Sequence, residues 1–168
     1  MTMYPWMKVL QPQPFDIVDQ HVKVAGVGTG FEATIGLRVR DGNSHELVRS
    51  FVTAGGMGVL GNFQAALALP GVPVTADGFV EVFDAGGTET PASMVVVPVV
   101  FGESLVEGYY GFALRTVEPG DTLSAIAHEA YGDASLFVRI FDANRNQLSD
   151  PNLVHPGQQL RVPMGRDI

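Results

Sequence analysis

Hydrophobic and polar residues alternate along much of the first hundred positions. The alternation is clearest in residues 31–40, whose apolar members are Phe31, Ala33, Ile35, Leu37 and Val39. A period of two places every second side chain on the same face, so a half-buried β-strand is predicted here. Residues 41–43 (DGN) are turn formers and residues 46–53 are again strand-like, so the two segments are predicted to pair as a hairpin.

Further short strand-like segments follow, with turn residues between them. They span residues 21–27, 63–69, 79–83 and 94–101, and a glycine-rich loop at 55–61 precedes the second of these. Six or seven short strands without a convincing helix are typical of two antiparallel sheets packed face to face. Residues 1–102 are therefore predicted to form an all-β, immunoglobulin-like sandwich, although the cysteine pair of antibody domains is absent.

After residue 111 the pattern becomes helical. The apolar positions of a first helix recur at three- and four-residue spacing, in Leu123, Ile126, Ala127, Ala130 and Tyr131. Asp121 or Thr122 can cap its start, because either side-chain oxygen can accept a backbone N–H of the first turn, and Gly132 is expected to end it.

A second helix is predicted to begin at Asp133 or Ser135 and to end at Asn144, a residue type that tolerates the left-handed conformation. Its inward positions are Phe137, Ile140 and Phe141. Strand-like segments at 114–118 and 159–163 flank the helix pair. We therefore expect a small α+β domain of order βααβ in residues 112–168, joined to the first domain by a short linker at 103–111.

Three blocks of the second half, TVEPGDTLSAIA, YGDASLFVRIFDANRNQ and PNLVHPGQQLRVP, resemble the LysM family over its whole length. The resemblance implies a non-catalytic module that binds glycans containing N-acetylglucosamine, such as peptidoglycan or chitin. It further implies a shallow groove between the loops at 119–123 and 150–155. The contacts carried over are Gly120, Asp121, Thr122, Leu123, Asn152, Leu153 and Val154.

Five of these residues also have a purely structural interpretation. Asp121 and Thr122 are needed as caps whether or not a sugar binds. Leu153 and Val154 can simply fill a small core, and Asn152 is a common turn residue.

Residues 9–102 resemble the Gmad2 immunoglobulin-like domain named from bacterial spore-germination proteins. The resemblance rests on the opening QPQPFDIV, the strand VKVAGVGTG, the segment FEATIGLRVRDG, the glycine-rich loop before Phe63, and the closing run SMVVVPVVF. It implies a scaffold or interaction role without a catalytic motif.

Charge and composition narrow the function further. Eighteen acidic and ten basic residues give a net charge of −8, which repels nucleic acid and anionic lipid. The chain has no cysteine, and its four histidines lack metal-ligand spacing, so neither a metal nor a cofactor is expected. Ser104 lacks a nucleophile-elbow pattern, and Glu103 and Glu107 are interpreted as linker solubility, so the protein is not expected to be an enzyme.

Residues 1–14 contain no apolar run typical of a secretory signal, and the longest apolar stretch, 94–101, is far below the roughly 20 residues of a spanning helix. We therefore expect a cytoplasmic protein without membrane insertion, with association with the cell envelope left open.

Three functions stay open at this point. The first is recognition of an N-acetylglucosamine-containing glycan, with the β-sandwich as scaffold. The second is an intracellular adaptor or assembly component, as in phage-tail-like baseplates, that binds protein. The third is a potassium or small-ligand sensor, because the segments YGDASLF and IFDAN resemble the LysM half of bacterial cytoplasmic potassium-binding proteins, in which a BON domain takes the place of the sandwich. The oligomeric state is not indicated.

Overall fold

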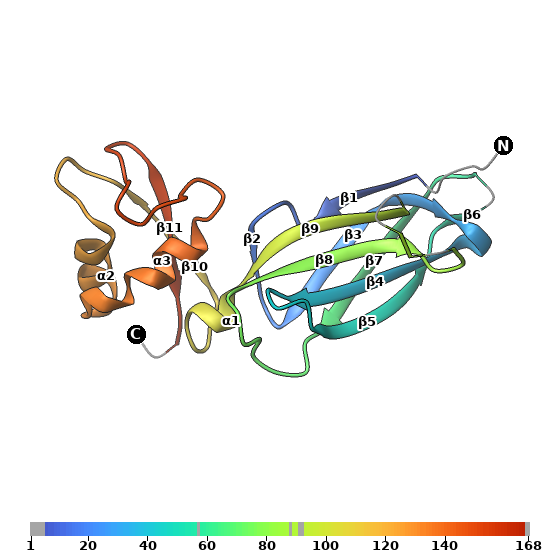
Figure 1. Cartoon of the computed structure of the whole chain (residues 1–168), viewed down its shortest axis with the longest axis horizontal. Coiled ribbons are helices and arrows are strands. Elements are labelled where there is room, and N and C mark those ends of the chain that lie inside the picture. Colours follow the sequence, from blue (N-terminus) through green and yellow to red (C-terminus); the bar gives the residue numbers. More distant parts are fainter. Residues whose placement is uncertain (1–5, 57, 88, 91–92, 167–168) are drawn as a thin grey trace.

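The computed structural model describes residues 6–56, 58–87, 89–90 and 93–166, which form a β-rich part followed by a smaller part with helices (Figure 1). Residues 1–5 and 167–168, at the outer limits of the two predicted domains, lie outside the described residues. The described chain is rich in strands and has few helices.

One sheet of the β-rich part is organised by the long strand β3 (His21–Gly30). It pairs antiparallel with β1 (Met7–Gln11) and with β7 (Gly61–Ala68), while the two-residue strand β6 (Gly55–Gly56) runs parallel to its end. Strand β1 was not predicted, because Val9 and Leu10 are adjacent apolar residues and break the alternation on which the prediction depended.

The other sheet has five strands in the order β2 (Asp16–Val18), β9 (Met94–Phe101), β8 (Asp77–Asp84), β4 (Thr34–Asp41) and β5 (Glu46–Thr53). Neighbouring strands run antiparallel except β2, which is parallel to β9. The predicted hairpin is confirmed as β4 and β5. Its turn is held by the Asp41 carboxylate, which accepts the N–H groups of Asn43 at 3.0 Å and His45 at 2.8 Å.

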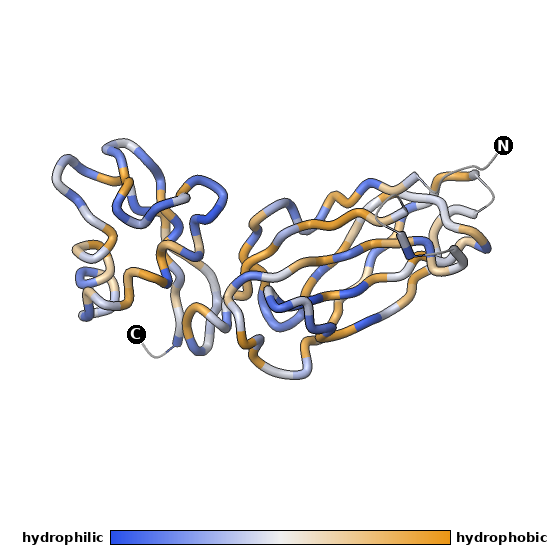
Figure 2. The backbone as a smooth tube through the Cα atoms, in the orientation of Figure 1, coloured by the Kyte–Doolittle hydropathy of each residue, from blue (hydrophilic) through white to orange (hydrophobic). Residues whose placement is uncertain are grey.

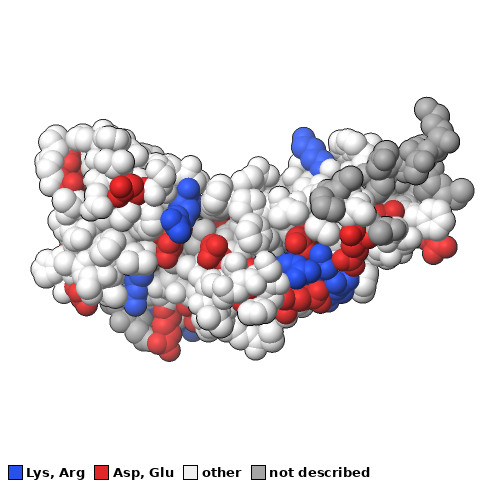
Figure 3. Space-filling view, viewed as in Figure 1, with Lys and Arg blue, Asp and Glu red and all other residues white. Residues whose placement is uncertain are grey.

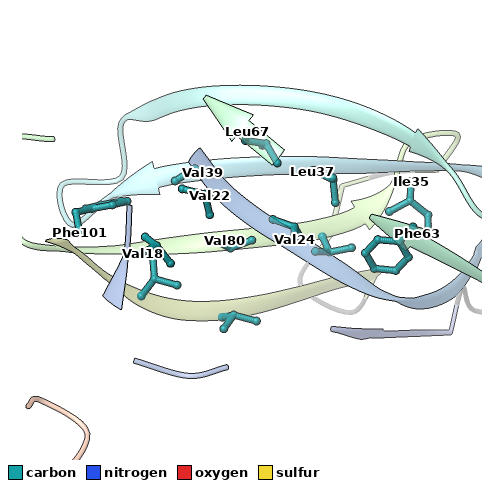
Figure 4. Close-up of a cluster of buried hydrophobic side chains, with 13 residues drawn as sticks. Val18, Val22, Val24, Ile35, Leu37, Val39, Phe63, Leu67, Val80 and Phe101 are labelled. Atoms are coloured by element: carbon teal, nitrogen blue, oxygen red, sulfur yellow. The ribbon is translucent and has the colours of Figure 1, made fainter. Parts of the chain in front are cut away.

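A hydrophobic core lies between the two sheets (Figure 4). Strand β4 contributes Ile35, Leu37 and Val39, which are fully buried as the alternation predicted. They face buried side chains of the other sheet, Val22, Val24, Phe63 and Leu67. The same alternation is visible as changing hydropathy along the strands (Figure 2).

The predicted strand of residues 31–40 begins later than expected. Residues Phe31–Ala33 form a short 3-10 turn, η1, in which Glu32 and Ala33 have φ of 56° and 61°, and strand β4 starts only at Thr34. The turn is fixed by the buried Asp84 carboxylate, which accepts the N–H of Phe31 at 2.9 Å. Phe31 is consequently 65% exposed instead of inward-facing.

The outer face of the five-stranded sheet carries a network of ion pairs (Figure 3). Arg38 is buried there, bonded to the carboxylates of Glu81 and Glu89. Its guanidinium lies 5.1 Å from the centroid of the Phe83 ring, which packs directly on Gly36 of the neighbouring strand. A face that the sequence indicated as solvated is thus covered by a cation, an aromatic ring and carboxylates together.

The smaller part is built on a two-stranded antiparallel sheet, β10 (Gly111–Thr116) with β11 (Gln159–Met164). Between these strands come helix α2 (Leu123–Tyr131), the 3-10 turn η3 (Ala134–Leu136) and helix α3 (Phe137–Ala143). The first strand starts three residues before the predicted position.

The caps of the first helix are confirmed. Thr122 accepts the N–H of Ala125 at 3.1 Å, and Gly132 ends the helix with φ of +73°, the left-handed region that glycine adopts without strain. Asp133 caps η3 rather than α3, accepting the N–H of Ser135 at 2.8 Å. Leu123, Ile126 and Ala127 are buried against the sheet as predicted.

Asn144 ends α3 but not in the expected way, since its φ of −122° is not left-handed. Its side chain is fully buried and acts as a clamp: Nδ2 donates to the carbonyls of Ile140 and Arg161, each at 2.7 Å, and Oδ1 accepts the N–H of Arg161 at 2.8 Å. The end of the helix is thereby fixed to strand β11.

The segment expected to be a linker is folded against both parts. Helix α1 (Gly102–Leu105) follows β9 directly, and Leu105 joins a small buried cluster with Val100 of β9 and Ala143 of α3. The carboxylate of Glu103 accepts the N–H groups of Gly108 at 2.9 Å and Tyr109 at 3.1 Å, so Glu103 is a structural acceptor and not a solvated linker residue.

We predict that Gly36→Ala lowers the free energy of unfolding by about 1–3 kcal/mol, because a Cβ at this position would overlap the Phe83 ring. Gly71→Ala is the matched control, since no atom lies within 4 Å of a Cβ there, and it should stay within about 0.5 kcal/mol of the parent. Urea unfolding measures both, and equal midpoints for the two variants would contradict the packing argument.

We predict that Asn144→Ala lowers the free energy of unfolding of the helical part by about 2 kcal/mol or more, since it leaves backbone groups of Arg161 and Ile140 unpaired. Circular dichroism at 222 nm follows this part, because α2 and α3 are its main helices. Asn62→Ala, at an exposed position of β7, serves as the control. A transition unchanged in both variants would show that the clamp adds nothing.

Candidate functional site

Two loops of the helical part leave its sheet at the same end. In the antiparallel register Thr116 pairs with Gln159, so the end of β10 lies beside the start of β11. The pairing continues for one more residue, because Val117 donates its N–H to Gln158 at 2.9 Å and accepts the N–H of Gly157 at 2.8 Å. The turn after β10 and the loop before β11 therefore emerge together, at the end of the sheet away from helix α1 (Figure 1).

The first loop is a tight turn held by its own side chains. The Asp121 carboxylate accepts the N–H of Glu118 at 2.8 Å, and Asp121 donates its own N–H to the Glu118 carbonyl at 3.1 Å. Gly120 forms the tip with φ of +93°, exposed, and with open space on its Cβ side. A rigid turn with a bare peptide tip is the result.

The electrostatics of this turn are set by Arg115 of β10. Its guanidinium lies 3.5 Å from the Asp121 carboxylate and 3.3 Å from that of Glu129 on α2. The arginine thus ties strand, turn and helix together and compensates the carboxylate that holds the turn.

The second loop is organised by Asp150. Its Oδ1 accepts the backbone N–H of Asn152 at 2.8 Å and the Asn152 side-chain amide at 3.0 Å, while its carbonyl accepts the N–H of Leu153 at 3.2 Å. Leu153 is 56% exposed at the surface, and Val154 packs against the core. The loop therefore presents one large apolar side chain on a turn that is fixed from within.

The seven residues proposed from the sequence occupy these two loops, with different exposures. Exposed side chains or backbone belong to Gly120, Thr122, Asn152 and Leu153, and Asp121 is half-buried. Leu123 is only 2% exposed, so its side chain supports the loop from the core and cannot cover a ligand methyl group in this conformation. Thr122 and Asp121 both carry the structural bonds that the alternative interpretation assigned to them.

The structure also forms a pocket that the sequence did not predict. A cavity of about 250 Å³ lies where the β-rich part meets the helical part, and its walls include Asp16, Lys23, Phe112 and Arg161. These residues are far apart in the sequence, so no local motif indicates their proximity. The exposed positions of β10 are the nearest signal, but the strand was predicted to start after Phe112.

Ser104, the side chain considered as a nucleophile, has a structural partner. Ser104 donates its hydroxyl to the Pro73 carbonyl at 2.8 Å. Within the described ranges, no group of three or more histidines and carboxylates is placed to hold a metal ion. The same residues include no helix that is both long and apolar enough to cross a membrane.

Comparison with known families assigns both parts of the chain. Residues 7–87 match Gmad2, the immunoglobulin-like domain of bacterial spore germination, and residues 116–163 match the LysM domain. Both are binding-type domains.

Individual relatives match over shorter stretches. The potassium binding protein Kbp of Escherichia coli is 52% identical over 48 residues of the LysM region, which are 29% of this chain and 32% of the relative. An uncharacterized protein of Deinococcus radiodurans is 47% identical over 53 residues, covering 32% of this chain and 20% of the relative. An esterase of Mycobacterium tuberculosis is 47% identical over 55 residues, covering 33% of this chain and 12% of the relative.

The chain thus spans about a third or less of the length of each of these relatives. Most of the length of each relative lies outside the aligned segment, so the relative's name describes a larger protein. The domain matches are the broader result: this chain contains a Gmad2 immunoglobulin-like domain in residues 7–87 followed by a LysM domain in residues 116–163.

Proposed function

We propose that this protein is a non-catalytic binding protein whose LysM domain recognises a glycan containing N-acetylglucosamine, of the peptidoglycan or chitin type. The observation that carries the proposal is the LysM match at 116–163, in a chain whose two fixed loops emerge side by side from one end of the sheet. No cofactor takes part.

The chemistry of the loops suits an acetamido sugar. Such a sugar presents an amide N–H, a carbonyl and a methyl group, so its site needs backbone hydrogen bonds beside an apolar surface. The bare peptide groups at Gly120 supply the former, and the exposed side chain of Leu153 supplies the latter. The contacts proposed are Gly120, Asp121, Thr122, Asn152, Leu153 and Val154, with Leu123 holding the first loop from below.

Preorganisation supports the same function. Both loops are fixed by short side-chain to backbone bonds from Asp121 and Asp150, so little conformational entropy is lost when a ligand binds. A shallow site with few contacts depends on this, because it has little surface with which to offset an ordering cost.

In this proposal the Gmad2 domain is an immunoglobulin-like β-sandwich that serves as a scaffold. Its end away from the LysM domain exposes several large apolar side chains, namely Trp6, Phe31, Val59 and Leu60, each by half or more. Exposed apolar side chains gathered at one end are typical of a protein contact. This feature favours a second function, an adaptor or assembly component that binds protein rather than glycan.

We expect a titration of the ¹⁵N-labelled full chain with an N-acetylglucosamine pentamer to shift the amide signals of Gly120–Thr122 and Asn152–Val154. Leu153→Ala should weaken binding about tenfold, the loss expected for removing most of one buried apolar contact. Val138→Ala is the matched control, because Val138 is similarly exposed on helix α3.

Amides of both loops that stay unmoved at saturating glycan would reject the proposal. A second test is a pull-down of the full chain on insoluble peptidoglycan or chitin, in which retention supports recognition of the polymeric glycan. A chain that is not retained on either polymer but captures a defined protein through the Phe31 end would favour the adaptor.

A further inference from the structure

The cavity of about 250 Å³ at the domain junction is separate from the two LysM loops. Its LysM wall is made by Phe112 and Arg161, which lie within strands β10 and β11, and its other wall by the segment around β2 and the start of β3. Figure 1 places β2 on the side of the Gmad2 domain that faces the LysM domain. The cavity therefore exists only while the two domains are joined as they are here.

Arg161 is the fixed element of the cavity. One of its guanidinium nitrogens donates to the Phe15 carbonyl of the Gmad2 domain at 2.9 Å, and another donates to the Asn146 side chain at 3.0 Å. Its charge lies 5.9 Å from the centroid of the Phe112 ring. Burial lowers the pKa of Arg161 from its ordinary value, and the nearby Asp16 partly opposes that shift.

The charges of the lining cancel. Asp16 and Asp19 line the cavity together with Lys23 and Arg161, so two carboxylates are balanced by two cations. Each carboxylate also accepts one backbone N–H, from Gln13 at 2.8 Å and from His21 at 2.7 Å. A lining without net charge attracts neither anions nor cations strongly, but it offers many donors and acceptors. Within the described part of the chain, Lys23 has no carboxylate within ion-pair distance, which leaves its ammonium available.

An apolar strip leads out of the cavity along β10. Tyr110, Phe112 and Leu114 alternate along the chain and are 64%, 45% and 64% exposed. They lie on the face of the sheet opposite to Leu160 and Val162, whose side chains form the LysM core with the helices. The strip is therefore uncovered. From Phe112 at the cavity, Leu114 lies toward the end of the sheet where the loops emerge, and Tyr110 lies on the opposite side.

An uncharged, polyhydroxylated ligand fits this combination. A sugar ring has faces of C–H groups that stack on aromatic rings, and an equatorial belt of hydroxyl groups that pair with carboxylates, amides and cations. The cavity is smaller than the range of about 300–1,000 Å³ that takes drug-sized ligands, so it has room for a small unit such as a single ring.

We propose that the junction cavity and the strip of Tyr110, Phe112 and Leu114 form a second carbohydrate subsite, which holds one sugar ring while the glycan chain continues along β10 toward the LysM loops. The proposal rests on the proposed function for the class of ligand only. Its geometry does not depend on the loops, so the two claims can fail separately.

The test is a titration of the ¹⁵N-labelled full chain with an N-acetylglucosamine hexamer. Besides the loops, the amide signals of residues 16–23 and 110–114 should shift. Phe112→Ser should weaken hexamer binding about tenfold, as expected for one lost aromatic contact. Lys23 is exposed and lines the cavity but not the strip, so Lys23→Gln should weaken hexamer binding severalfold. Val96→Ser is the control, because Val96 lies exposed on the outer face of the sheet that contains β9, and it should have no effect.

The outcomes separate the two claims. Shifts confined to the loops overturn the second subsite and leave the proposed function intact. Shifts confined to the junction support the subsite and overturn recognition by the loops, and no shift in either region overturns both. Junction shifts caused equally by inorganic phosphate at the same concentration would overturn the carbohydrate assignment. If Phe112→Ser does not fold, Leu114→Ser and Lys23→Gln decide.

Discussion

The arrangement of this molecule depends on the clamp between Asn144 and Arg161. A buried amide at the end of α3 satisfies both backbone groups of one residue in β11, and that residue then extends its side chain across the domain boundary to the Phe15 carbonyl. A buried polar group left without such partners would cost about 1–3 kcal/mol, so the bonds define one register of helix on strand. The position of β11 in turn places Arg161 in the wall of the cavity and in contact with the Gmad2 domain.

Much of this fold can be predicted from local patterns. Period-two alternation placed Ile35, Leu37 and Val39 in the core, and the capping chemistry of Thr122 and Gly132 gave the limits of α2. These predictions succeed because each depends on a few neighbouring residues. Alternation alone could not show that Phe31 and Ala33 belong to a turn, since that depends on the Asp84 carboxylate 53 positions away from Phe31.

The two candidate sites also differ in whether they depend on residues that are close together in the sequence. The loops at 119–123 and 150–155 could be proposed from the sequence, because the LysM resemblance rests on the order and spacing of residues along the chain. The junction cavity was not, since Asp16 and Arg161 meet only after two domains have folded and docked. The burial of Arg38 could not be predicted for a related reason. An arginine in a strand is expected to be exposed unless its cross-strand partners, here Glu81, are known.

The strands of the Gmad2 domain run along the long axis of the molecule, and β9 passes directly into α1 at the junction (Figure 1). A tensile force applied between the exposed Phe31 end and the LysM loops would act parallel to those strands. Hydrogen bonds of an antiparallel ladder such as β8 with β9 would then be loaded in shear, all at once, and not peeled one by one.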